Sequence, residues 1–177
     1  LGVFWHTQGS GKSYSMVFLA QKIHRKVEGS PTIVILTDRA ELNKQISGTF
    51  EACGCLGNVK ASKYVASSGD DLIKKLKANP SYIFSVIQKF NKDNEDPIHT
   101  DYDILLISDE AHRTQNGVFA NNMCKLLPEA SRIGVTGAPL FSFDNITQRT
   151  FGDYVSIYEF KRAVDDGATV PLYDGNR

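Results

Sequence analysis

The stretch that decides the fold is LGVFWHTQGSGKS, residues 1–13, in which an apolar run leads directly into glycine, serine and lysine. Residues 2–5 are typical of a buried β-strand, and Lys12 opens a segment with apolar side chains at helical spacing. Small residues between a strand and a helix let backbone N–H groups approach an anion, and the helix N-terminus adds positive potential. The sequence therefore predicts a phosphate-binding loop at a strand-to-helix junction.

Each residue type in this loop has a chemical use. Lys12 can reach the β and γ phosphates of a bound nucleotide, and Ser13 can ligate magnesium. The pattern G-x-x-x-x-G-K-[ST] fails only at its first position, where His6 replaces a glycine that shapes the entry into the loop. A plain Gly/Ser turn that caps a helix is the alternative. The predicted nucleotide-binding residues are Thr7, Gln8, Gly9, Ser10, Gly11, Lys12 and Ser13.

A second chemical feature, the pair Asp109-Glu110, directly follows the apolar run Ile104 to Ser108. The carboxyl ends of parallel strands meet at one edge of a sheet, so we expect this pair to lie beside the phosphate-binding loop. Asp109 is suited to hold Mg²⁺, and Glu110 is suited to orient and deprotonate an attacking water. The catalytic candidates are therefore Lys12, Asp109 and Glu110. Taken alone, an Asp-Glu pair is also typical of a helix N-cap.

Apolar runs typical of strands alternate with amphipathic segments typical of helices along the chain. Near-continuous runs, such as Ile33 to Leu36, indicate strands buried on both faces. The expected strands are Gly2 to Trp5, Thr32 to Thr37, Tyr82 to Ile87, Ile104 to Ser108 and Arg132 to Thr136, and the expected helices are Lys12 to Val27, Arg39 to Phe50 and Asp70 to Leu76. This alternation predicts an α/β fold with a parallel central sheet flanked by helices.

The composition favours one ordinary globular domain. The chain has 177 residues, of which 41% are hydrophobic and 23% are charged, and its formal net charge is zero. Residues 1–89 carry 12 Lys and Arg against 6 Asp and Glu, whereas residues 90–177 carry 8 against 14. The whole chain therefore gives no argument for nucleic-acid binding, although the first half permits a basic face.

The cysteine count and the apolar runs bear on the cellular compartment. Three cysteines are too few for a disulfide framework. No two histidines have the spacing of metal ligands that could complete a zinc site with Cys53 and Cys55. No apolar run approaches the roughly 18 residues that a membrane span needs, and no signal peptide is present. We expect a soluble protein in a reducing compartment, the cytoplasm, with no membrane partner.

Three motifs resemble motifs I, II and III of superfamily 2 helicases and translocases, in the same order. They are His6 to Ser13, Asp109 to His112 and Thr136-Gly137-Ala138-Pro139-Leu140. Flanking strings extend the likeness, over nearly the whole chain, to the motor subunit of type I restriction enzymes, the R subunit. These strings are Thr37 to Leu42, Val86 to Phe90, Asp109 to Arg113, Phe151 to Tyr154 and Ala163 to Pro171.

The resemblance implies a RecA-like P-loop NTPase domain, the first lobe of a motor that hydrolyses ATP with Mg²⁺ to translocate double-stranded DNA. By this likeness Lys12 and Ser13 bind phosphate and magnesium, while Asp109 and Glu110 serve hydrolysis. The implied coupling residues, which relay the nucleotide state to DNA, are His112, Thr136, Gly137 and Ala138. Further implied partners are a second RecA-like domain and a nuclease domain of the same polypeptide, and separate methyltransferase (M) and specificity (S) subunits in a bacterial or archaeal cytoplasm.

The likeness also places four residues on the DNA track, namely Thr37, Arg39, Gln88 and Lys89. Arg39 and Lys89 are chemically suited to contact phosphates, whereas Asp38 is better suited to orient a neighbour. Plainer alternatives stay open for both cations. Arg39 could simply begin a helix, and Lys89 could be a solvated surface charge.

Two departures from the family pattern limit what is expected. Ala138 stands where threonine is common, so the missing hydroxyl either weakens the relay or is replaced by Thr136. Motifs IV to VI are absent, and with them the arginine that stabilises charge at the γ phosphate, a role not assigned to Arg113, Arg132 or Arg149. Such an arginine contributes about 10³- to 10⁵-fold in rate. We therefore expect weak nucleotide binding and negligible turnover from this segment alone, which also lacks identifiable nuclease residues.

The sequence starts inside an apolar strand without an initiator methionine, so we expect a segment of a longer polypeptide. Residues 1–177 are interpreted as the first RecA-like motor domain, with a sheet core at about 1–140 and a lead-out toward the second lobe at 141–177. The alternatives are a type III restriction or DNA repair translocase, a non-hydrolysing nucleotide-dependent interaction domain, and a purely structural domain. The motifs do not encode the DNA recognition sequence, the polarity and step of translocation, or the oligomeric state.

Overall fold

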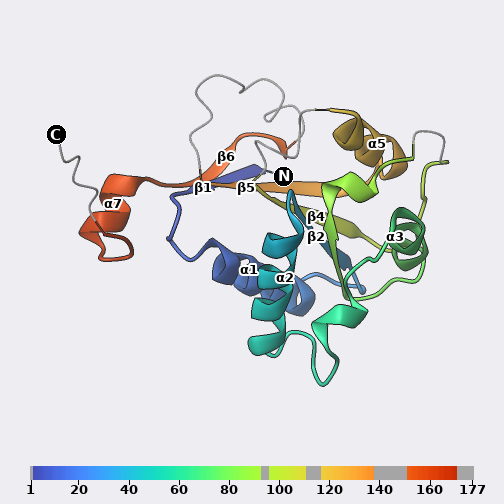
Figure 1. The fold of residues 1–177 in the computed structure, drawn as a ribbon, viewed down its shortest axis with the longest axis horizontal. Helices are drawn as coiled ribbons and strands as arrows, with labels where there is room; N and C mark the ends of the chain where they lie inside the picture. Colours follow the sequence, from blue (N-terminus) through green and yellow to red (C-terminus); the bar gives the residue numbers. More distant parts are fainter. Residues whose placement is uncertain (1, 93–95, 111–116, 138–150, 171–177) are drawn as a thin grey trace.

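A parallel sheet runs through the middle of the molecule in the computed structural model, which describes residues 2–92, 96–110, 117–137 and 151–170 (Figure 1). The order across the sheet is β3-β2-β4-β5-β1-β6, and each of these neighbouring pairs is parallel. The strands are β1 (Gly2–His6), β2 (Thr32–Thr37), β3 (Tyr82–Val86), β4 (Ile104–Asp109), β5 (Ser131–Thr136) and β6 (Tyr154–Tyr158).

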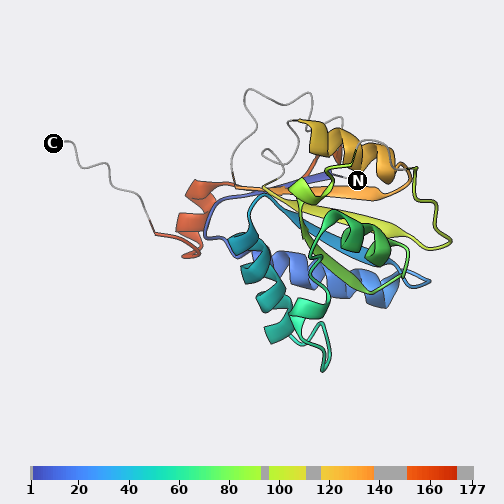
Figure 2. The same ribbon diagram turned by 45° about the vertical axis from the view of Figure 1, so that its right-hand side comes forward.

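Helices cover both faces of this sheet. They are α1 (Lys12–Lys26), α2 (Ala40–Ala52), α3 (Gly69–Leu76), α5 (Val118–Leu126) and α7 (Phe160–Asp165), with short 3₁₀ turns η1 (Ala61–Lys63) and η2 (Ile87–Lys89). One face is covered by α1 and α2 and the opposite face by α3 and α5, as the turned view in Figure 2 also shows. Helix α7 lies beyond the edge of the sheet at which β1 ends, on the left of Figure 1.

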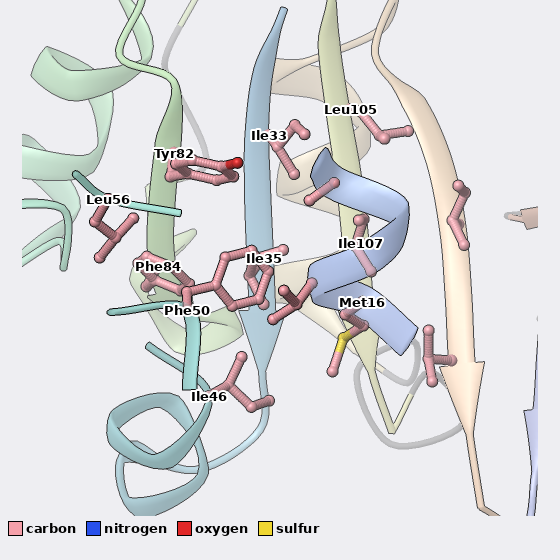
Figure 3. Close-up of a cluster of buried hydrophobic side chains, with 14 of the residues drawn as sticks. Met16, Ile33, Ile35, Ile46, Phe50, Leu56, Tyr82, Phe84, Leu105 and Ile107 are labelled. Carbon is pink, nitrogen blue, oxygen red and sulfur yellow. The ribbon is translucent and has the colours of Figure 1, made fainter. Parts of the chain in front are cut away.

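The two faces of β2 explain why its sequence is apolar throughout. All six residues of β2 are buried, and successive side chains point to opposite faces. Ile33 and Ile35 pack with Met16 of α1 and Phe50 of α2 in the cluster drawn in Figure 3. Val34 and Leu36 belong to the cluster on the other face. Because burying each such side chain contributes about 1.5–3 kcal/mol, this strand is a main source of stability.

Strand β6 extends the sheet beyond residue 140, where the sequence pattern had suggested that the core ends. It pairs with β1 in parallel, with a register irregularity between Val3 and Phe4. The pairing depends on Gly2, because a Cβ there would lie 2.4 Å from Cγ1 of Val155 and 3.0 Å from the carbonyl oxygen of Asp153. The side chains of β6 are mostly exposed, so no buried apolar run marks this strand in the sequence.

The predicted parallel α/β sheet is confirmed, and each of the predicted strands and helices is present near its expected bounds. Helices α5 and α7 were not predicted. In α5 the apolar face is interrupted by Asn122, which is itself buried and donates a hydrogen bond to the carbonyl oxygen of Phe90 at 3.0 Å. None of the helices in the described ranges is both long enough and apolar enough to cross a membrane.

Candidate functional site

The predicted site residues follow the carboxyl ends of β1, β4 and β5, which meet at one edge because the strands are parallel and adjacent. The phosphate-binding loop, residues 7–11, joins β1 to α1. Asp109 is the last residue of β4, and Thr136 is the last residue of β5. Gly137 follows directly. The topology thus brings together three motifs that are far apart in the sequence.

The loop has the local geometry expected of an anion site. Gly9 and Gly11 adopt left-handed backbone conformations, with φ of 83° and 82°, which glycine tolerates without steric cost. The hydroxyl of Ser10 donates to the carbonyl oxygen of Thr7 at 2.6 Å, which closes the turn. Gly11 is the N-cap of α1, and the first turn of this helix contains no acidic residue. The helix N-terminus therefore presents positive potential without a competing carboxylate.

Three functional groups converge on the small volume that Gly137 leaves open. A Cβ at Gly137 would lie 3.0 Å from Nζ of Lys12, 3.7 Å from the backbone nitrogen of Gln8 and 3.7 Å from Oε1 of Glu110. An ammonium, a backbone N–H and a carboxylate thus surround one point beside the phosphate-binding loop. The first two can bind a phosphate oxygen, and the third can accept a proton from water.

The two members of the acidic pair differ, because Asp109 is buried whereas Glu110 is partly exposed and has a strained backbone. Asp109 is 4% exposed, and burial together with the charge of Glu110 raises the pKa of Asp109 to about 6, with Lys12 acting in the opposite direction. Its Oδ1 atom has no hydrogen-bond partner among the described residues. Glu110 has a φ of 53°, a left-handed conformation that costs a non-glycine residue about 1–2 kcal/mol. Strain of this kind clusters at functional sites.

A buried carboxylate oxygen without a partner fits a divalent cation. Mg²⁺ prefers oxygen ligands and is usually held by one or two carboxylates together with the phosphates of a substrate. No group of three or more His, Cys, Asp or Glu residues that could form an all-protein metal cage exists in the described ranges. Asp109, with Ser13 in the first turn of α1, therefore suits a magnesium ion that arrives with a nucleotide.

His6, the residue that departs from the loop pattern, is built into the sheet edge. Its Nε2 lies 2.8 Å from the hydroxyl of Ser156 in β6, and its ring meets the ring of Tyr158 edge-on at 5.8 Å. Burial, and to a lesser extent the charge of Lys12, lower the pKa of His6. Sequence reasoning gave Ser156 and Tyr158 no role, because the mostly exposed strand β6 carries no local signal of its pairing with β1.

The predicted DNA-contact residues lie at the ends of β2 and β3, at the same edge of the sheet, and most are engaged within the protein. Thr37 is fully buried, and its hydroxyl donates to the carbonyl oxygen of Arg39 at 3.1 Å. The amide of Gln88 donates to the carbonyl oxygen of Asp38 at 2.9 Å. Lys89 donates to the carbonyl oxygen of Ala66 and has a pKa lowered by burial.

Arg39 differs from the other three candidates. Its side chain is 65% exposed, and Nε lies 3.4 Å from a carboxylate oxygen of Asp38. This contact agrees with the prediction that Asp38 orients a neighbour.

Two of the predicted coupling residues, His112 and Ala138, lie outside the described residues, whereas Thr136 is fully buried at the end of β5.

Comparison with known proteins gives this geometry a context. The family model of the SWI2/SNF2 ATPase matches residues 1–177. The chain is 42% identical over 197 aligned residues to the type I restriction enzyme HindI endonuclease subunit of Haemophilus influenzae, covering 100% of this chain and 18% of that protein. It is 38% identical over 178 residues to a putative type I restriction enzyme MjaIXP endonuclease subunit of Methanocaldococcus jannaschii, covering 98% and 17%. The chain thus spans less than a fifth of these relatives.

Solved structures share the fold at lower sequence identity. The helicase domain of Pyrococcus furiosus Hef superposes with a TM-score of 0.65 at 20% identity, covering 89% of this chain and 34% of that one. The ATP-dependent type ISP restriction-modification enzyme LlaBIII, solved bound to DNA, gives a TM-score of 0.60 at 16% identity, covering 94% and 14%. The predicted RecA-like fold and the predicted resemblance to superfamily 2 motors and type I restriction subunits are confirmed.

Proposed function

The chain belongs to the SWI2/SNF2 ATPase family, and from this premise we propose that residues 1–177 are the first motor lobe of a type I restriction endonuclease R subunit. In this proposal the lobe binds Mg-ATP, and its hydrolysis drives the translocation of double-stranded DNA that precedes cleavage. The observation that carries the proposal is the convergence of Lys12, Gln8 and Glu110 around Gly137, next to the buried carboxylate of Asp109. This combination supplies phosphate binding, metal binding and a base at one edge.

The residues divide the reaction between them. The backbone N–H groups of residues 8–13 and the Lys12 ammonium hold the phosphates, and Ser13 and Asp109 are the residues that would hold magnesium. A bound magnesium ion supplies charge neutralisation at the terminal phosphates. Glu110 orients the attacking water and accepts its proton as the water oxygen bonds to the γ phosphorus. The bond from that phosphorus to the bridging oxygen of ADP breaks, so ADP leaves and inorganic phosphate remains beside Lys12.

The same edge suggests how the nucleotide state reaches the rest of the motor. Gly137 follows the buried Thr136, and any shift of Lys12 or Glu110 on hydrolysis acts directly on this turn. We assign the coupling role to Thr136 and Gly137, and by family likeness to His112 and Ala138. The remaining parts of the machine are proposed from the relatives: a second RecA-like lobe with the catalytic arginine, a nuclease domain, and M and S subunits.

The proposal is tested in the complete subunit with two substitutions of opposite character. Lys12→Ala is expected to abolish ATP binding, whereas Glu110→Gln is expected to retain binding and lose DNA-stimulated hydrolysis. Lys22→Ala and Glu41→Gln, at exposed positions of α1 and α2, are matched controls expected to behave as the wild type. Phosphate release and equilibrium binding of Mg-ATP are the measurements.

Each outcome of this test separates the candidate functions. Hydrolysis at the wild-type rate in Glu110→Gln would remove Glu110 as the base. Nucleotide binding without hydrolysis in the wild-type subunit would indicate a nucleotide-dependent switch. Hydrolysis that is stimulated by DNA in the absence of M and S subunits, without any restriction activity in their presence, would indicate a different superfamily 2 translocase.

A further inference from the structure

The phosphate-binding loop is attached to the last strand of the sheet by a side chain that the usual loop pattern does not provide. His6 is paired with Tyr158 in the β1–β6 register, and its imidazole reaches across to the hydroxyl of Ser156 at 2.8 Å. A glycine, the residue expected at this position, has no side chain with which to make that bond. The departure from the pattern therefore coincides with a specific contact.

Backbone contacts continue this attachment into the loop. The N–H of Thr7 donates to the carbonyl oxygen of Tyr158 at 3.0 Å, one residue beyond the end of β1. A Cβ on Gly9 would lie 3.5 Å from the hydroxyl of Thr169, which shows how closely the turn after α7 approaches the loop. Contacts at residues 6, 7 and 9 thus all involve the segment from β6 to Thr169, in the turn that follows α7.

The segment that receives these contacts is itself held in place. The N–H groups of Ala168 and Thr169 both donate to the carbonyl oxygen of Ala163, at 2.8 and 3.2 Å, so the turn is fixed to α7. The hydroxyl of Tyr158 donates to a carboxylate oxygen of Asp166 at 3.0 Å, which ties the end of β6 to the same helix. Because these contacts link the loop to β6 and α7, a displacement of the phosphate-binding loop would either move α7 or strain its contacts.

We propose that His6 and Ser156 are positioning residues that clamp the phosphate-binding loop to β6 in the geometry that accepts a nucleotide. The inference rests on the proposed function, since it concerns the same loop. Burial and the neighbouring Lys12 lower the pKa of His6 and favour the neutral imidazole, whose tautomer sets whether Nε2 donates to the Ser156 hydroxyl or accepts from it. The clamp thus leaves Lys12 as the charged group that meets the phosphates.

The test compares Ser156→Thr with Ser156→Val in the complete subunit. These two side chains have nearly the same shape, both suit a strand, and only threonine keeps the hydroxyl. The Kd of the non-hydrolysable Mg-AMP-PNP is expected to rise about 2- to 10-fold in Ser156→Val, the range for one lost hydrogen bond, and to stay at the wild-type value in Ser156→Thr. Ser131→Val, at the exposed start of β5, is the matched control.

A second pair probes the other partner of the clamp. His6→Gln keeps a polar nitrogen near the position of Nε2 and is expected to bind like the wild type, whereas His6→Leu is expected to bind as weakly as Ser156→Val. Because the two residues form one bond, His6→Leu combined with Ser156→Val should bind no more weakly than either single variant. If Ser156→Val does not fold, the His6 pair decides the question.

Two results would overturn the clamp. One is equal Kd values for the threonine and valine variants, and the other is additive losses in the double variant. Lys12→Ala, titrated alongside, separates this failure from a failure of the proposed function. Loss of binding in Lys12→Ala with no effect at Ser156 removes the clamp alone, whereas wild-type binding in Lys12→Ala removes the nucleotide site itself.

Discussion

Two sets of loops leave the same edge of the sheet and use their polar side chains in opposite ways. In the loops after β1, β4 and β5, the side chains of Lys12 and Glu110 converge on the volume left open by Gly137. In the loops after β2 and β3, Gln88 and Lys89 are hydrogen bonded to main-chain carbonyl oxygens of Asp38 and Ala66. We propose that the first set receives a ligand, whereas two side chains of the second set are hydrogen bonded to the main chain.

The contrast shows that a motif residue should be judged by what its polar atoms already contact. Lys12 and Lys89 are both lysines in family motifs near the carboxyl end of a strand. The ammonium of Lys89 donates to the carbonyl oxygen of Ala66. Replacing Lys89 would therefore leave this buried acceptor without a hydrogen bond. The ammonium of Lys12 lies beside a carboxylate and a backbone N–H, where a phosphate can join them.

The largest effect is expected from Gly69→Ala, at the start of α3, where the glycine packs against the loop after β3. A Cβ at Gly69 would lie 2.9 Å from the backbone carbonyl oxygen of Lys89 and 2.8 Å from Oδ1 of Asn91. Backbone cannot move away cheaply, so local stability should fall by about 1–3 kcal/mol. Hydrogen exchange of the α3 amides in the complete subunit measures this. Gly48→Ala, on the exposed face of α2 with open space around it, should instead stabilise by about 0.5–1 kcal/mol. Unchanged protection in Gly69→Ala would contradict the packing described.

Gly137→Ala is expected to give the complementary result in the first set of loops. The added methyl group would meet the flexible end of Lys12 at 3.0 Å, so the fold should tolerate it while the ammonium is displaced. Small displacements of catalytic groups are costly, and we expect kcat for DNA-stimulated ATP hydrolysis to fall about 10-fold. Steady-state kinetics and thermal unfolding of the same preparation measure both properties. A loss of stability without a loss of kcat would show that Gly137 serves packing and not the position of Lys12.

A smaller effect should distinguish Arg39 from Lys89 in DNA binding. Each phosphate contact releases counterions, so losing one lowers the slope of log Kd against log salt by about 1. Arg39→Met is expected to lower the slope by this amount because its side chain is exposed. Lys89→Met should leave the slope unchanged and weaken local stability instead. Titrations of double-stranded DNA at several salt concentrations provide the measurement, and a lower slope in Lys89→Met would place that lysine on the DNA.

The smallest effect is a pH dependence of stability carried by His6. Its folded pKa lies below the ordinary value of 6.5, so the unfolded chain takes up a proton first as the pH falls. The wild-type protein should therefore lose unfolding free energy between pH 6.5 and the lower folded pKa. His6→Asn should lose less over the same window, with the other histidines contributing equally to both proteins. Parallel pH profiles for the two proteins would count against a half-buried His6 with a lowered pKa.

The central sheet could be predicted, and candidate nucleotide motifs could be proposed, because their signals in the sequence are local. A strand such as Ile33 to Leu36 is apolar at every position, since both faces are buried, and the glycines of the loop are needed by its backbone. The strand order could not be predicted, because the sequences of β1, β4 and β5 contain no signal that specifies which strands pair with each other. The convergence on Gly137 is a consequence of that order.

The features that were missed depend on contacts between distant residues. Strand β6 has exposed side chains and is recognised only by its pairing with β1 and by the close approach of Val155 to Gly2. The internal bond of Lys89 to Ala66 spans 23 positions, and nothing in either residue's neighbourhood indicates it. Neither the burial of Asp109 nor the left-handed backbone of Glu110 was predicted from the sequence.

The bond between His6 and Ser156 joins residues 150 positions apart, which has a consequence for how the protein is made. At about 5–20 residues per second, the ribosome completes β6 roughly 8–30 s after it has produced the phosphate-binding loop. During that interval β1 has an unpaired edge that can pair with another chain. Long-range pairing of this kind is also slow to form. If the loop binds nucleotide as proposed, the nascent chain should acquire this capacity only when β6 pairs with β1.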